Sequence, residues 1–281
     1  MTRGDGDYAL MQNAWHAQWS HNRYRAYYPW TIGGAVWSMY DYNRGCCDNI
    51  CYSGLADLFR LPKFGLLYFR TQMKEGTFTP AGPMTYEVFI NSHWLEGSSD
   101  TLQVYGNVDE VKLQLNGRVI ARQYPDDKPS TSEYVSRPDG GNAENIDFPP
   151  FTFFNVNWER GELKAIGYKD GKAVAEHVVR TPGAVEAMDI TYFESGVSAS
   201  CRDLLIVYVN LKDLQGTGCF GENNREVKLE VLQGGELRGP ATIKAEAGVA
   251  SFLVATTDSP MLVLKAVSGN LETMRKLKLK K

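Results

Sequence analysis

The chain has 281 residues, of which 43% are hydrophobic and 22% are charged. This composition is ordinary for a globular protein and excludes a disordered or low-complexity chain. The 30 Lys and Arg residues nearly balance the 33 Asp and Glu residues, for a formal charge of -3. No nucleic-acid partner is expected, because nucleic-acid binders normally present a basic face. No membrane partner is expected either, since no apolar stretch approaches the roughly 18 residues of a membrane helix.

The first 75 residues alternate between helical and strand-like patterns. A helix is predicted over residues 8–22, and Pro29 must end it. Its apolar face is predicted to carry Leu10, Met11, Ala14 and Trp15. Residues 32–40 form a nearly continuous apolar run that suits a strand covered on both faces. A second helix is predicted over residues 62–70, with Pro62 in its first turn. Together these elements indicate a piece of an α/β fold.

From residue 84 onward the pattern predicts strands alone. Asn116-Gly117 and Asp170-Gly171 separate alternating runs, and such pairs are strong signals for hairpin turns. Residues 126–145 are polar and rich in Pro, Gly and Ser, which predicts an exposed loop. Thr181-Pro182-Gly183 is predicted to be a second domain boundary. Further strands are predicted over residues 185–192, 204–211, 227–232, 250–255 and 261–267. The spacing fits two β-sandwiches of about 100 residues each.

The five cysteines permit two interpretations. Free thiols are one of them. The other, for an oxidising compartment, is a disulfide from Cys51 to Cys46 or Cys47 and a second between Cys201 and Cys219. Zinc is not expected, because the cysteine cluster lacks a second ligand pair at the usual spacing. No other metal and no cofactor is predicted.

The candidate binding residues lie at the end of the apolar run. Trp37 and Asp41 lie in its last part, just before a long irregular loop, and in α/β barrels active sites form at this end of the strands. A Trp ring can offer its face to the C–H groups of a sugar, while a carboxylate accepts hydrogen bonds from its hydroxyls. The alternative for Trp37 is plain core packing.

Several segments resemble glycoside hydrolase family 2, and its bacterial β-galactosidases in particular. Residues 33–42 and 53–63 (GGAVWSMYDY and SGLADLFRLPK) are similar to the last strand, loop and helix of the family's barrel. Residues 93–94, 104–117 and 161–171 are similar to the immunoglobulin-like module after the barrel. The resemblance implies a mainly β chain, with two immunoglobulin-like β-sandwiches (81–181 and 182–281) preceded by a partial (β/α)8-barrel segment (1–80).

The resemblance also implies a reaction, the retaining hydrolysis of β-glycosides. That chemistry requires two Glu carboxyls roughly 5 Å apart. The first Glu of this chain is Glu75, which follows the last barrel helix. We therefore expect no catalytic residue here and no activity from this chain alone. The remainder of the barrel, or another chain, is the expected protein partner.

Residue roles follow from the same resemblance. Trp37 matches the Trp that floors the sugar subsite, with a cis peptide bond to Ser38, and Asp41 borders that subsite. Tyr42 and Arg44 either border it or stabilise the loop, while Arg60 and Lys63 are expected to be structural.

The resemblance bears on substrate and location as well. Cys51 and Ser53 occupy the places of an Asn-x-Lys that binds the sugar carboxylate in the family's β-glucuronidases, which favours a neutral sugar such as galactose. The expected ligand is therefore a β-galactoside. The resemblance suggests a periplasmic or secreted protein, although no signal peptide is visible. The alternative function is a non-catalytic carbohydrate-binding or scaffolding module that uses the aromatic segment 148–154.

Overall fold

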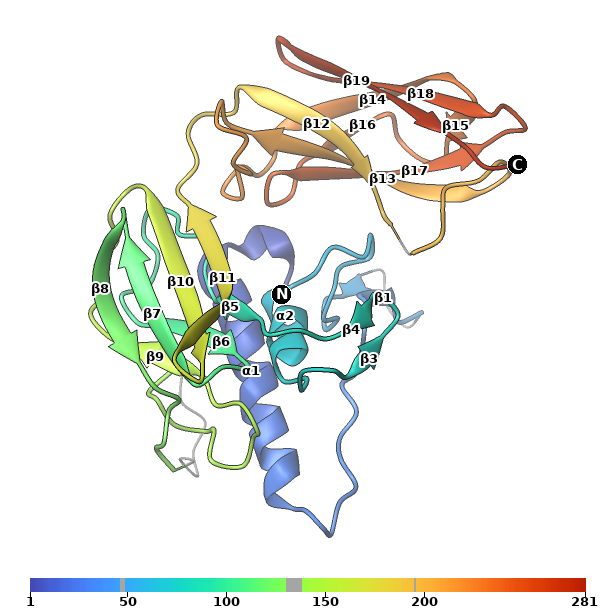
Figure 1. Cartoon of the computed structure of the whole chain (residues 1–281). Helices are drawn as coiled ribbons and strands as arrows, with labels where there is room; N and C mark the ends of the chain where they lie inside the picture. Colours follow the sequence, from blue (N-terminus) through green and yellow to red (C-terminus); the bar gives the residue numbers. More distant parts are fainter. Residues whose placement is uncertain (46–48, 130–137, 195) are drawn as a thin grey trace. The chain divides into compact units, whose positions relative to one another are not determined.

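The computed structural model describes residues 1–45, 49–129, 138–194 and 196–281. The chain is mainly β and divides into two compact units, Met1–Thr181 and Pro182–Lys281, which are described separately (Figure 1). The helical elements of the first unit are η1 (Arg3–Asp5), α1 (Asp7–Ala26) and α2 (Phe64–Thr71). Its strands are β1 (Tyr42–Asn43), β2 (Ile50–Cys51), β3 (Phe78–Thr79), β4 (Gly82–Pro83), β5 (Val88–Ile90), β6 (Leu102–Gly106), β7 (Glu110–Leu115), β8 (Arg118–Gln123), β9 (Phe151–Phe153), β10 (Glu162–Lys169) and β11 (Lys172–Arg180).

Both predicted helices are present, with shifted ends. Helix α1 runs four residues beyond the predicted end, and all four residues predicted for its apolar face are buried. Helix α2 begins at Phe64, so Pro62 lies before the helix and not in its first turn. The reason is local: Lys63 has extended backbone, and its N–H donates to the Leu55 carbonyl at 2.9 Å. That bond holds residues 62–63 in the preceding loop.

The buried strand predicted over residues 32–40 does not form. Among the described residues, the only bridge from this segment joins Tyr40 to Ala56. Ile32 is fully exposed, and Val36 and Trp37 are exposed as well. The prediction is wrong for a physical reason: a strand requires hydrogen-bonded neighbours, and no described strand of this chain pairs with residues 32–39. The segment nevertheless follows α1 closely, because a Cβ on Gly34 would lie 2.4 Å from the Tyr24 ring.

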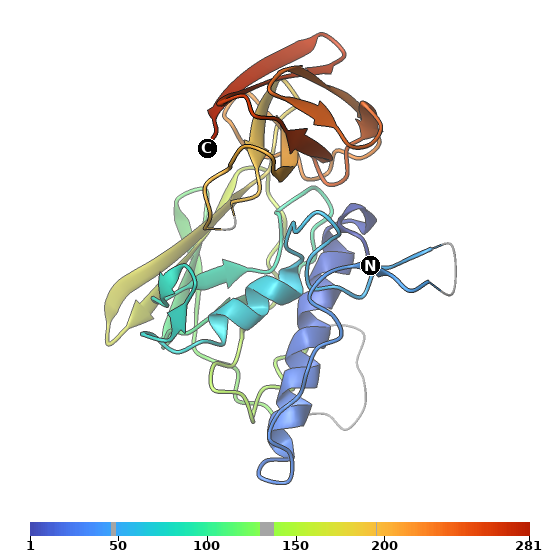
Figure 2. The ribbon, with the colours of Figure 1, turned by 90° about the vertical axis from the view of Figure 1, so that its right-hand side faces the viewer.

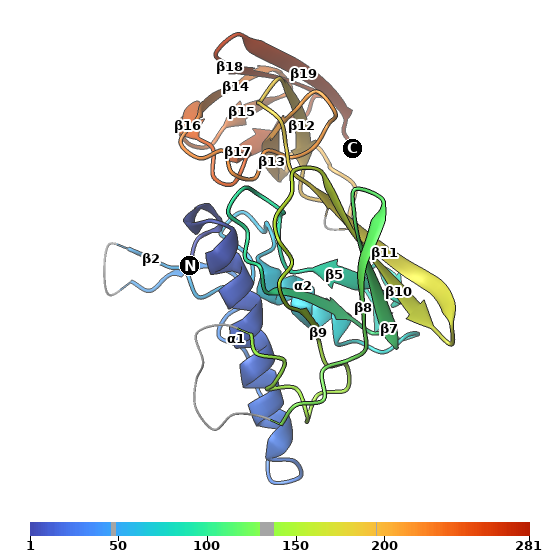
Figure 3. The same ribbon diagram turned by 90° about the vertical axis from the view of Figure 1, so that its left-hand side faces the viewer.

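Three layers build the rest of the first unit. The sheet β5-β6-β9 lies between the two helices and the sheet β11-β10-β7-β8 (Figure 3). Between the two sheets lies a core that includes Ile90, Trp94, Val104 and Leu163. On the other side, Phe89 and Tyr105 join the cluster that α1 and α2 build, and the two helices lie side by side (Figure 2). The helices and the strands therefore share cores within one unit.

Both predicted hairpins are confirmed. Asn116-Gly117 joins β7 to β8, and Asp170-Gly171 joins β10 to β11. The prediction of an exposed loop over 126–145 is confirmed for residues 127–129, which are exposed, but it is wrong for residues 140–143, which are buried. Gln18 of α1 causes this, since its amide donates to the carbonyls of Gly141 and Asn142 at 3.1 Å each. Residues 130–137 lie outside the described part.

The second unit is a β-sandwich of two antiparallel four-stranded sheets, β12-β13-β17-β15 and β16-β14-β18-β19. Its strands are β12 (Ala187–Tyr192), β13 (Leu204–Lys212), β14 (Glu226–Gln233), β15 (Gly235–Leu237), β16 (Thr242–Lys244), β17 (Val249–Thr256), β18 (Met261–Ser268) and β19 (Leu271–Lys278). The five strands predicted here are all present. One core fills the space between the sheets, because alternate residues of β13, such as Val207 and Val209, face inward.

The described cysteines are free. Cys51 and Cys201 are partly exposed, and Cys219 is buried. A Cys201–Cys219 disulfide is therefore absent, and the two thiols contact different backbone carbonyls, those of Ser259 and Gly183. Cys46 and Cys47 lie outside the described residues. No helix in the described part of the chain is long and apolar enough to cross a membrane.

A polar cluster fastens the start of α1 to the turn after β5. Asp7 accepts hydrogen bonds from the backbone N–H of His93 at 2.8 Å and from the Ser92 hydroxyl at 2.7 Å. Its carboxylate also lies 3.2 Å from Nδ1 of His93. Burial alone would raise the pKa of Asp7, but the bonds and charge of His93 and the Ser92 bond outweigh burial and lower it. The ionised carboxylate therefore stabilises the fold.

This cluster predicts a loss of stability in acid. Because the folded-state pKa of Asp7 lies below its ordinary value of 3.8, its contribution is complete above that value and disappears as the pH falls through the folded pKa. Asp7→Asn should lower the free energy of unfolding by about 2 kcal/mol at pH 6. Urea unfolding measured from about pH 6 to about pH 3 should show the difference shrinking with acid. A difference independent of pH would contradict the role given to the carboxylate.

Candidate functional site

The candidate site is built around Trp37, where the extended segment 32–39 approaches β1. The Trp37 side chain is exposed, with 76% of the residue's surface accessible, but a hydrogen bond at its Nε1 edge fixes its position. Its Nε1–H donates to the Tyr42 hydroxyl at 2.7 Å, and the two rings meet edge to face with centroids 6.0 Å apart. The peptide bond between Trp37 and Ser38 is cis, as expected. The result is an oriented, solvent-facing aromatic surface.

Tyr42 is itself held by the short ladder β1–β2, in which it pairs with Cys51. The Cys51 thiol lies 3.4 Å from the Ser53 hydroxyl. Hydrogen bonds with Ser53 and Tyr42, together with the charge of Arg44, lower the pKa of Cys51. Trp37 therefore contacts a phenol that itself neighbours the Cys51 thiol, whose pKa also responds to the charge of Arg44. The sequence left the role of Tyr42 open, because a bond between side chains five residues apart depends on the turn between them.

Asp41 lies beneath this surface and faces the protein interior. Its Oδ1 accepts hydrogen bonds from Nζ of Lys63 at 2.7 Å and from the backbone N–H of Gly54 at 2.9 Å. Both charged side chains are almost fully buried, at 2% exposure for Asp41 and 0% for Lys63. Lys63 Nζ also donates to the Tyr52 carbonyl at 3.3 Å. The ion pair therefore joins three parts of the chain: the end of the extended segment, the following loop and the start of α2.

Gly54 makes this arrangement possible. A Cβ at this position would lie 2.3 Å from the backbone nitrogen of Asp41, closer than any side chain can approach. Arg60 also contributes, since its guanidinium lies 3.7 Å from the centre of the Tyr40 ring. Both contacts hold the loop against residues 40–41, and they agree with the structural roles expected for Arg60 and Lys63.

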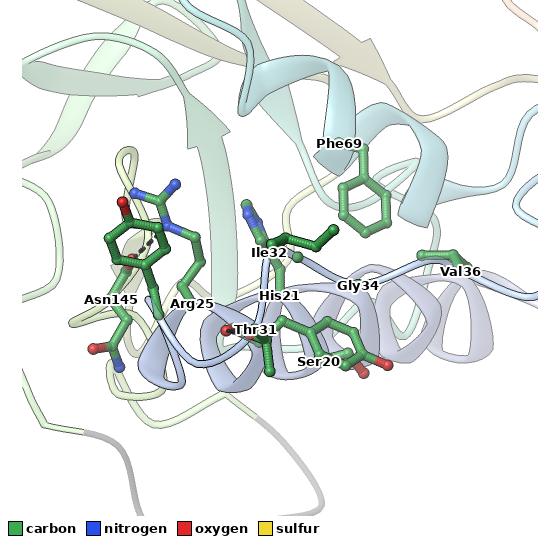
Figure 4. A pocket seen from close by; sticks show the side chains of 12 residues that line it. Ser20, His21, Arg25, Thr31, Ile32, Gly34, Val36, Phe69 and Asn145 are labelled. Atoms are coloured by element: carbon green, nitrogen blue, oxygen red, sulfur yellow. Dashed lines mark hydrogen bonds between the residues drawn. The ribbon is translucent and has the colours of Figure 1, made fainter.

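A separate cavity lies elsewhere in the first unit. It has a volume of about 630 Å³ and is bordered by the second half of α1, the segment 28–36 and Phe69 of α2 (Figure 4). Its polar groups are engaged with neighbours: His21 Nδ1 lies 2.9 Å from the Tyr68 hydroxyl, and Arg25 donates to the Asn145 carbonyl at 3.1 Å. Trp37 is not among its lining residues. The cavity and the candidate sugar surface are therefore separate features.

The aromatic segment 148–154 is largely buried. Phe151 and Phe153 lie in the core between the sheets, and Phe154 is about half exposed. The described residues also contain no group of three or more acidic, His or Cys side chains that could hold a metal ion.

Comparison with known proteins identifies the family. Residues 97–175 match a family model described as Domain of unknown function (DUF4982). A β-galactosidase of Thermoanaerobacter pseudethanolicus is 31% identical over 85% of this chain, and a β-glucuronidase of Formosa agariphila is 27% identical over 72%. A solved β-glucuronidase of glycoside hydrolase family 2 shares the fold over 96% of this chain, with a TM-score of 0.73 and 20% identity.

The chain covers only 32%, 18% and 27% of these three proteins, respectively. It is thus a glycosidase-family segment, shorter than the proteins that it matches. Within that class, the chain is a C-terminal segment of a glycoside hydrolase family 2 protein, related to its β-galactosidases and β-glucuronidases.

The buried ion pair predicts a large, specific stability loss. Lys63→Met leaves the Asp41 carboxylate buried without its counter-charge and should lower the free energy of unfolding by about 3–5 kcal/mol. Adding Asp41→Leu removes that orphaned charge, so the double variant should be more stable than Lys63→Met alone. Urea unfolding followed by tryptophan fluorescence measures both changes.

Lys74→Met is the matched control. The Lys74 side chain is 70% exposed in its ion pair with Asp147, and exposed pairs contribute less than about 1 kcal/mol. Equal losses for Lys63→Met and Lys74→Met would show that the buried pair has no special role.

Proposed function

We propose that this chain is the C-terminal portion of a periplasmic or secreted retaining β-glycosidase that acts on β-galactosides. In this proposal residues 1–80 complete a (β/α)8 barrel, and residues 81–181 and 182–281 form immunoglobulin-like sandwiches. Trp37 and Asp41 belong to the sugar subsite, and the catalytic Glu pair comes from outside this chain.

The observation that carries the proposal is the exposed, oriented ring of Trp37. A large aromatic side chain normally becomes buried in a folded protein. This ring instead faces solvent while its Nε1–H is bonded to Tyr42. An indole fixed in this way offers a flat apolar face at little entropic cost, which suits stacking against a sugar ring.

Asp41 supports the subsite from below. One carboxylate oxygen accepts both the Lys63 and Gly54 bonds, and an ionised carboxylate can accept further hydrogen bonds on its other oxygen. Its burial gives it mainly a positioning role toward the Trp37 surface, with contact to a sugar hydroxyl as a second role once the site is complete.

The side chains near Trp37 favour a neutral sugar. Cys51 and Ser53 lie at the places where a carboxylate-binding Asn and Lys are expected in β-glucuronidases of this family. Lys63, which donates to the Tyr52 carbonyl between these two positions, is fully buried and already bonded to Asp41, which leaves Arg44 rather than a lysine as a cation of this loop. A sugar carboxylate would therefore find no free lysine at these positions, whereas galactose requires none.

Three described carboxylates of residues 1–80 make structural bonds, which supports a catalytic pair supplied from elsewhere. Asp57 accepts from the backbone N–H groups of Phe59 and Leu61, at 2.8 and 2.9 Å, and lies near Arg3. Asp7 holds the turn at His93, and Asp41 is paired with Lys63. None of these three carboxylates is placed as a partner for retaining hydrolysis.

The exposed segment 32–37 supports completion of a barrel by further strands. Apolar side chains on both of its sides are exposed, since Val36 and Trp37 are adjacent in an extended segment and both are exposed. Backbone groups and apolar side chains of this kind are satisfied when neighbouring strands pair with them. The remainder of the barrel, in the same or another polypeptide, is the partner that fits.

Galactoside binding tests the subsite. Titration of this chain with methyl β-galactoside, followed by the NMR signals of the tryptophan indoles, should perturb Trp37. Trp37→Ala should weaken binding by up to about tenfold, because stacking on one aromatic ring is worth roughly 0.5–1.5 kcal/mol. Methyl β-glucuronide should bind more weakly than the neutral sugar.

Trp30→Ala is the matched control, since Trp30 is 91% exposed in the same segment but has no place in the proposed subsite. Equal effects of both variants, or the absence of any galactoside binding, would overturn the subsite. Hydrolysis of nitrophenyl β-galactoside should be undetectable. Turnover at enzyme-like rates would overturn the absence of a catalytic pair.

A further inference from the structure

A row of lysines lies along one edge of the second unit. Lys276 and Lys278 are exposed on β19, and Lys280 is exposed just beyond it; these three residues are called the lysine row. Alternate residues of an extended strand point to the same side, about 6.8 Å apart. β19 is the last strand of the sheet β16-β14-β18-β19 (Figure 1). The row therefore presents three positive charges along roughly 14 Å of sheet edge.

The charges of the lysine row are not neutralised by ion pairs. Within the described part of the second unit, other cations form the pairs Arg202–Asp258, Lys212–Asp189, Lys228–Glu230, Arg238–Glu236 and Lys265–Glu272. No such pair involves the lysine row. Glu272, the acidic residue of β19, is bonded to Lys265, which lies on the neighbouring strand.

Apolar side chains flank the row where acids would be expected in a solvated, salt-bridged face. Across the ladder, Lys276 lies opposite Val263 and Lys278 lies opposite Met261. Met274, two residues before Lys276, is about half exposed. Val263 is buried and Met261 is partly buried, so Met274 is the exposed apolar side chain among these three. Cations beside such a group suit a ligand that combines regularly spaced anions with C–H surfaces.

We propose that the lysine row binds an anionic polysaccharide, one that carries carboxylate or sulfate groups along the chain. The choice of a polysaccharide rests on the proposed glycosidase function, whereas the choice of an anionic one rests on the unpaired lysines. The row lies in the second unit and the Trp37 surface in the first. In this proposal the galactoside bound at the Trp37 surface belongs to a polymer whose acidic groups bind the lysine row.

Lysines on an edge strand have a competing explanation, since they also prevent edge-to-edge pairing between molecules. The two roles predict different results when the charges are removed. Loss of a binding site leaves the oligomeric state unchanged and weakens polyanion binding. Loss of edge protection produces oligomers or aggregates and leaves any polyanion binding unchanged.

The test is the binding of the full chain to polygalacturonate, measured by calorimetry or on affinity gels. The triple variant Lys276→Gln/Lys278→Gln/Lys280→Gln should bind at least about tenfold more weakly and elute like the wild type in size-exclusion chromatography. Raising NaCl from about 0.05 M to about 0.5 M should weaken wild-type binding similarly, because exposed charges are screened. Neutral galactan should show neither effect.

The matched control is Lys74→Gln/Lys164→Gln/Lys172→Gln, which makes the same change in net charge within the first unit. Equal weakening by both triple variants, or no polygalacturonate binding by the wild type, would overturn the proposal. Single-stranded DNA bound as tightly as polygalacturonate would also overturn it, because that would indicate a general polyanion surface. Binding to carrageenan, a sulfated polysaccharide, is compared with binding to polygalacturonate. Tighter binding to carrageenan indicates that the lysine row prefers sulfate groups, and weaker binding indicates that it prefers carboxylate groups. Methyl β-galactoside binding at Trp37 is measured separately, so either proposal can fail alone.

Discussion

The buried ion pair between Lys63 and Asp41 is the constraint on which the candidate site depends. Two charges removed from water are stable only when each faces its partner and the remaining polar groups are bonded. Lys63 meets this condition with Asp41 and the Tyr52 carbonyl. The pair therefore fixes the start of α2 relative to residue 41. The position of Trp37, four residues before Asp41, follows from that anchor and from its bond to Tyr42.

The helices of the first unit are not an independent body. Phe89 and Tyr105, from β5 and β6, complete the cluster in which Leu10 and Tyr68 are buried. Asp7 adds a polar connection from α1 to His93. One β-sheet thus packs against helices on one face and against a second sheet on the other, so it belongs to both cores of the first unit.

The extended segment 32–37 and the lysine row are two surfaces whose groups lack partners in the described part of the chain. Apolar side chains and free backbone groups at residues 32–37 are satisfied by continued sheet pairing. The unpaired charges of Lys276 and Lys278 are satisfied by counter-ions in water or by an anionic ligand. We therefore propose a protein partner for residues 32–37 and a polyanion for the lysine row. Both proposals therefore follow from which groups remain without a partner of the right chemistry in the described chain.

Local rules determined much of this protein from sequence alone. Apolar periodicity placed α1, and the Asn-Gly and Asp-Gly pairs placed two hairpins, because both signals act over a few residues. The family resemblance supplied the cis bond at Trp37. Only the tertiary structure decided that residues 32–40 remain without a ladder, that Asp41 faces Lys63 and that Gln18 holds the flank of the long loop. Each of these depends on groups far apart in the chain, whose meeting no local pattern encodes.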